Sequence, residues 1–170
     1  PEPLSNHPRK IIAPFFADVD TRNQSSGVVN WGTGTVNNRP AWAANYVRVG
    51  YYSSRADKVN TFQVVLIERS DTGSGNFDIE FNYDSIQWEA GDEDGGVAGL
   101  CGSGCVAPTV GYSNGLTGGA NVSFQLDGSR VPGAFLDSNP NGLRYRTRNS
   151  TVRGRLVFEV RAGVVQALAI

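Results

Sequence analysis

Apolar and polar residues alternate along much of the chain, which is the spacing of a β-strand with one face in the core and one in water. In the clearest example, segment 77–84, the apolar residues Phe77, Ile79, Phe81 and Tyr83 alternate with Asp78, Glu80, Asn82 and Asp84. After this segment the apolar residues move to the even positions Ile86 and Trp88. A bulge or bend near residues 84 and 85 returns both sets to the core, and we expect one there.

Other segments predict further strands. Residues 61–69 are apolar on both faces, which is typical of a central strand, and 71–76 suits a hairpin loop. Residues 45–52 predict a strand with Val47, Val49 and Tyr51 on one face, preceded by a possible helical turn at 39–44. Pro14 indicates an edge or a bulge because it lacks a backbone donor. Segments 27–34, 143–148 and 154–163 complete the set, the first as a short strand ending in a glycine turn and the last as the final strand.

These elements predict an all-β fold of about eight to ten strands without a long helix or an internal repeat. The 21 glycines among 170 residues suit tight turns and long glycine-rich loops. We therefore expect an antiparallel β-sandwich or an irregular barrel. The length fits a single domain covering residues 1–170.

Charge and hydropathy exclude several classes of partner. The 15 basic and 16 acidic residues nearly cancel, so no strong field draws the chain to nucleic acid or to an anionic membrane. No apolar run approaches the roughly 18 residues of a membrane-spanning helix. Because the sequence starts without Met and without the apolar core of a signal peptide, we expect a mature or excised piece of a larger protein.

The two cysteines, Cys101 and Cys105, are separated by three small residues, a spacing that can close a disulfide loop in an oxidising compartment. Free thiols are the alternative, whereas zinc would need two more ligands and the only histidine is His7. A single histidine also argues against a catalytic triad. No pair of carboxylates stands out for glycoside hydrolysis, so we expect no enzyme.

Three asparagines lie in Asn-x-Ser/Thr sequons, where glycosylation is one interpretation and chance the other: Asn23, Asn121 and Asn149.

Acidic residues before two glycines suggest a calcium loop. Asp92, Glu93 and Asp94 precede Gly95 and Gly96, and Asp18 and Asp20 are candidate helpers. Ca²⁺ binds six to eight oxygens from carboxylates and carbonyls. The spacing differs from that of an EF-hand loop, so a solvated acidic loop is the alternative, and calcium is a possible but not a required cofactor.

Arginines and tryptophans suggest a glycan or partner surface. Arg144, Arg146 and Arg148 alternate along one predicted strand, and Arg153 and Arg155 follow them. Trp42, with Trp31 and Trp88, could stack on a sugar ring. The alternatives are structural: pairing of the arginines with acids such as Asp78 and Glu80, and aromatic residues in the core.

Several motifs in consistent order resemble the NIDO domain, the extracellular module named after nidogen, especially its bacterial secreted and surface versions. They are IIAPFFADVDTR, the block from Gly50 to Gly96, GYSNG, GAFLDSNPNGL and RGRLVFEVRAG, which together cover residues 11–163. The Cys-Gly-Ser-Gly-Cys loop is not a general feature of that family.

The resemblance implies a secreted or cell-surface, non-enzymatic module of adhesive, matrix or biofilm proteins. Its expected partners are extracellular proteins, with copies of the chain itself, joined through edge strands, as one candidate. A carbohydrate-binding module and a calcium-dependent adhesion domain are the alternatives.

Overall fold

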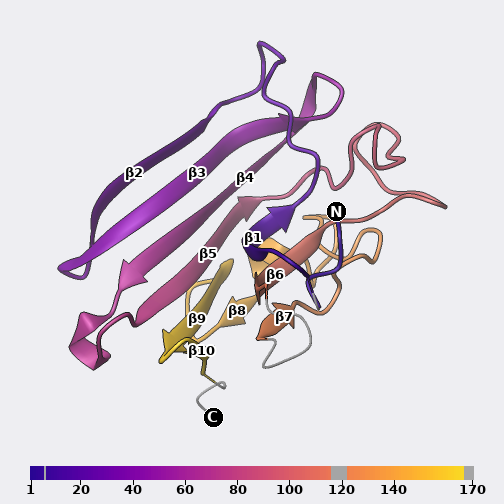
Figure 1. Cartoon of the computed structure of the whole chain (residues 1–170). Helices are drawn as coiled ribbons and strands as arrows, with labels where there is room; N and C mark the ends of the chain where they lie inside the picture. Colours follow the sequence, from indigo (N-terminus) through magenta and orange to yellow (C-terminus); the bar gives the residue numbers. More distant parts are fainter. Residues whose placement is uncertain (6, 116–121, 167–170) are drawn as a thin grey trace.

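A computed structural model of the chain describes residues 1–5, 7–115 and 122–166, and Figure 1 shows it as a β-structure of two sheets. The strands are β1 (Lys10–Phe16), β2 (Val29–Val36), β3 (Arg39–Tyr51), β4 (Arg55–Glu68), β5 (Phe77–Ser85), β6 (Thr109–Asn114), β7 (Ser123–Gln125), β8 (Thr147–Arg148), β9 (Arg155–Arg161) and β10 (Val164–Val165). Two short 3₁₀ turns, η1 (Ser70–Thr72) and η2 (Leu143–Tyr145), accompany them. Within the described residues, no helix is long and apolar enough to cross a membrane.

The larger sheet has the strand order β10-β9-β5-β4-β3-β2, with β8 added in parallel to β9, and the smaller sheet has the order β1-β6-β7. Neither sheet closes on itself, so the all-β prediction is confirmed as an open sandwich and the barrel alternative is wrong. Apart from β8, all paired strands are antiparallel.

Aromatic side chains from the two sheets form the core. Phe158 of β9 lies with its ring centroid 5.4 Å from Phe81, and Tyr112 and Phe124 of the smaller sheet approach Phe158 to 5.6 and 5.2 Å. The Tyr83 hydroxyl donates a buried hydrogen bond of 2.6 Å to the Pro14 carbonyl, across the sandwich. Such aromatic contacts add about 0.5–1.5 kcal/mol each beyond the burial of their surface.

The strand predicted at 77–84 is confirmed as β5, and so is its bulge. Phe62 pairs with Tyr83 but Thr61 pairs with Ser85, so Asp84 is an extra residue without a partner in β4. The extra residue restores Ile86 and Trp88 to the core, where both are fully buried. The central position of β4 is also confirmed, and loop 71–76 joins β4 to β5.

The predictions around β2 and β3 are partly wrong. The segment 39–44 continues as strand β3 and makes no helical turn, and β2 runs through both of its glycines to a two-residue turn at Asn37 and Asn38. Both turn residues have positive φ, which a hairpin of this type requires. Arg48 also has a positive φ at a register shift, so Val47 is exposed whereas Val49 and Tyr51 are buried.

The two ends of the described chain pack against the sheets. Pro14 lies at a register shift of the edge strand β1, as its missing donor predicts. His7 and Leu4, close to the start of the chain, are buried, and the His7 carbonyl accepts a hydrogen bond from Ser113. At the other end Val164 and Val165 form β10 and extend the chain's own larger sheet.

Candidate functional site

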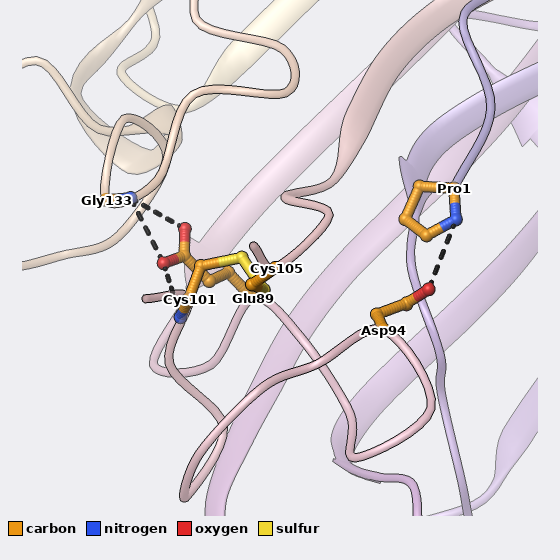
Figure 2. The surroundings of a disulfide bond; sticks show 6 residues. All are labelled: Pro1, Glu89, Asp94, Cys101, Cys105 and Gly133. Carbon is orange, nitrogen blue, oxygen red and sulfur yellow. Dashed lines mark hydrogen bonds and ion pairs between the residues drawn. A yellow bond between two sulfur atoms is a disulfide. The ribbon is translucent and has the colours of Figure 1, made fainter. Parts of the chain in front are cut away.

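The disulfide loop is attached to the rest of the protein by a buried carboxylate (Figure 2). Cys101 and Cys105 form the predicted disulfide, with a Cα–Cα distance of 5.3 Å. Glu89, which is 1% exposed, accepts a hydrogen bond of 3.0 Å from the Cys101 backbone and one of 2.8 Å from the Gly133 backbone. Burial raises the pKa of Glu89, and the two backbone donors act against that shift. Glu89 therefore connects two loops that are distant in sequence.

The five candidate calcium ligands do not converge on one ion site. Asp20 binds the Arg22 side chain, which with backbone donors holds its pKa well below the usual range, and Asp92 lies 3.1 Å from Arg55. Across the described chain, no group of three or more His, Cys, Asp or Glu side chains is placed to hold a metal ion. Calcium binding stays a prediction.

Asp18 and Asp94 remain as the close acidic neighbours at this site. Each has one buried carboxylate oxygen without a hydrogen bond, and Asp94 also forms an ion pair of 3.5 Å with the amino group of Pro1 (Figure 2). Burial, followed by the charges of Asp94, Asp20 and Glu93, raises the pKa of Asp18. The pair is therefore a local concentration of negative charge.

The arginine row predicted for segment 143–148 does not form, because the chain makes the turn η2 before β8. Arg144 lies 3.4 Å from Asp137, and Arg146 lies over the ring of Phe135. Arg148 lies over Phe158, 4.9 Å from the ring centroid. Of the two expected acidic partners, Glu80 pairs with Arg155, which follows the row, whereas Asp78 pairs with Arg69 and Arg161 instead. The three side chains thus pack against their own loops and the core.

The three tryptophans have different environments. Trp88 is fully buried and donates to the Val49 carbonyl, and Trp42 is partly buried against the core. Trp31 of β2 is 73% exposed. Its neighbours Val28 and Val29 are also exposed, so an apolar surface lies at the start of β2.

Strand β2 is the free outer strand of the larger sheet in the described chain. Its sequence, VNWGTGTV, contains no charged residue and no proline, and its pairing with β3 is continuous from Val29 to Val36. Natural edge strands usually carry charges, prolines or bulges that prevent pairing with other chains. The β2 edge lacks all three.

Two of the three sequons fall on described residues. The Asn23 side chain bonds to the Ser54 carbonyl, whereas Asn149 is exposed and makes a long contact of 3.4 Å with Val157. Asn121 lies outside the described residues. Glycosylation of these sites stays a prediction.

The nidogen-like domain model matches residues 32–162. The chain belongs to the NIDO family. The match runs from within β2 to just after β9, so β1 and the segment before it lie outside the matched residues. The NIDO family is a family of extracellular, non-catalytic structural domains. No curated protein and no solved structure matches the chain.

Two features of this NIDO chain were not apparent from the sequence. Glu89 lies in a stretch of acids and shows no local pattern that marks it as buried. The uncharged composition of β2 was visible, but only the strand order reveals that this strand is an edge.

We expect Glu89→Ala to lower the free energy of unfolding by about 3 kcal/mol, because it leaves two backbone N–H groups in the interior without an acceptor. Urea denaturation at neutral pH measures the change. Glu93→Ala, at an exposed position in the same acidic stretch, is the matched control and should stay within about 0.5 kcal/mol of the original protein. If Glu89→Ala lowers the free energy of unfolding no more than Glu93→Ala does, the Glu89 hydrogen bonds do not stabilise the fold.

Asp18→Asn tests the acidic pair. The pKa of Asp18 is raised in the folded state, so its contribution to stability is present at low pH and is lost as the pH rises through that pKa. The variant should therefore gain stability relative to the original protein between pH 4 and pH 7, roughly the range above the usual aspartate pKa. Thermal unfolding at both pH values measures the difference. A difference in stability between the variant and the original protein that does not change with pH contradicts the assignment.

Thermal unfolding with millimolar calcium chloride extends the same experiment. A calcium ion held by Asp18 would raise the melting temperature of the original protein but not that of Asp18→Asn, since only a ligand of the folded state stabilises it.

Proposed function

We propose that this NIDO chain is a structural, adhesive module that assembles extracellular protein, and that it does so by pairing the free edge of β2 with β2 of a second copy. The observation that carries the proposal is this edge: eight residues, uncharged, without a bulge, and not covered by any other strand of the described chain. An added strand gains a row of backbone hydrogen bonds along such an edge.

The other edges of the two sheets are poorer templates. Strand β10 has two residues and β7 has three. Strand β1 is longer, but it carries Lys10, Pro14 and a register shift. Short strands, charges, prolines and bulges are the features that keep edges from pairing. The difference between β2 and these strands directs association to one side of the molecule.

Charge and surface composition favour a second copy as the partner. Antiparallel pairing of β2 with itself brings no like charges together, because the strand has none, and the chain's net charge is only −1. The exposed Trp31, Val28 and Val29 lie next to the same edge and add apolar surface. Aromatic side chains of this kind are enriched at the centres of protein interfaces.

Thr33→Lys places a charge in the middle of β2 and tests the proposal. We expect it to weaken self-association by about tenfold or more, because each copy then brings a lysine to the shared edge. Sedimentation velocity across a wide range of protein concentration measures the association.

Ser74→Lys adds the same charge to an exposed loop between β4 and β5 and should leave association unchanged. The proposal fails if the original protein stays monomeric at every concentration, or if both lysine variants lose association equally.

A further inference from the structure

The outer face of the larger sheet, on the side away from the smaller sheet, carries a row of four amide side chains and one arginine that crosses five strands. Its members are direct cross-strand neighbours from β2 to β9: Asn30, Asn45, Gln63, Asn82 and Arg155. Gln63 donates to Asn45 at 2.6 Å, Asn82 donates to Gln63 at 2.9 Å, and Arg155 donates to Asn82 at 3.0 Å. We call these five side chains the amide row.

Beside the amide row the sheet surface is hollow. The next two cross-strand rows carry only glycine and alanine on β2 and β3, namely Gly32, Gly34, Ala41 and Ala43. On β4 they continue with Val65 and Ile67, and on β5 with Glu80 and Asp78. The resulting groove has a volume of about 860 Å³. This value lies within the range of roughly 300–1,000 Å³ that is usual for ligand sites.

The fold does not require the two glycines of the groove. Neither has a positive φ, and a Cβ atom built at Gly32 or Gly34 meets no atom within 4 Å. A glycine inside a strand costs roughly 0.5–1 kcal/mol relative to alanine. Such a residue often marks a place where a ligand or another backbone approaches closely. The empty space above β2 is thus not explained by packing within the chain.

The polar groups around the groove are suited to a neutral ligand. The groove is lined by four arginines and three carboxylates, so their charges nearly cancel. Glu80 lies 3.3 Å from Arg155, and Asp78 lies 2.7 Å from Arg69. The amide N–H groups of Asn45 make no hydrogen bond within the described chain and are available to a ligand. Side-chain amides both donate and accept, as hydroxyl groups do.

We propose that this groove binds a short, neutral oligosaccharide. The amide row takes the ring hydroxyls, and the partly exposed methyl groups of Ala41 and Ala43 contact the apolar face of the ring. Of the residues that the sequence suggested for a glycan, Trp42 borders the groove but packs partly buried against the core, and the three arginines at 144, 146 and 148 lie outside the groove. It also goes beyond the proposed association, because it uses the face of the sheet and not its edge.

A sugar fits this surface better than an extended peptide does. A peptide that binds as a strand needs unpaired backbone groups. The strands β3, β4, β5 and β9, which form the groove floor, are each paired on both sides. What the surface offers is side-chain amides, a guanidinium group and aliphatic carbon. These groups match a molecule with many hydroxyls and no charge.

The test measures binding of neutral oligosaccharides of glucose, mannose and galactose to the full chain by titration calorimetry, with oligogalacturonate as an acidic comparison. We expect at least one neutral sugar to bind and the acidic one to bind more weakly. Chemical-shift changes in the NMR spectrum should be concentrated at the amide row and at Ala41 and Ala43.

Gly32→Val fills the groove and should reduce the affinity about tenfold or more, while the melting temperature stays the same or rises because valine favours a strand. Thr33→Val, on the opposite face of β2, is the matched control and should bind as the original protein does. The inference is overturned if none of the neutral oligosaccharides binds, or if Gly32→Val binds the sugar as tightly as the original protein does. It is also overturned if the chain prefers the acidic sugar or an extended peptide. The edge variant Thr33→Lys is expected to change self-association but not sugar binding. The two proposals are therefore tested separately, and a failure of sugar binding would not contradict self-association through β2.

Discussion

The smaller sheet is too narrow to cover the larger one, and the surfaces of interest follow from this mismatch. Its three strands pack through Tyr112 and Phe124 against Phe158, on the side of β5 and β9. Figure 1 shows β2 and β3 extending away from it. No residue of β2 is buried, and Trp31 is largely exposed on the face that would otherwise continue the core. The uncovered part of the sheet thus supplies a free edge, an apolar inner surface and an open outer face.

Periodicity predicted the covered half of this molecule well. In β5 the alternation of aromatic and polar residues predicted both the face and the position of the bulge, because its apolar side chains all belong to or pack against the core. The same reasoning failed at Val47, where the positive φ of Arg48 shifts the register. It also failed for the arginines of 143–148, since an alternating pattern fits a strand but does not require one, and these residues turn through η2.

The candidate sites depend on pairing between distant segments, which no local pattern contains. The amide row exists only because Asn45, Gln63 and Asn82 take the same register position on three strands. The prediction that the polar residues of β5 face water is only partly correct. Glu80 and Asn82 face the groove, but Asp78 is buried beneath its two arginine partners. Glu89 resembles its acidic neighbours in sequence and differs from them only through Cys101 and Gly133.

The edge and the groove also constrain each other geometrically. Two antiparallel strands that join in one sheet are related by a two-fold axis perpendicular to it, so the outer faces of both copies lie on the same side. Strand β2 then lies in the middle of the joined sheet, and the glycines of both copies meet there as a shared hollow bounded by the two amide rows. A ligand long enough to span it would contact both copies and bind the assembled form more tightly than the single chain. By linkage such a ligand would strengthen the pairing of β2, whereas one confined to a single groove would leave it unchanged.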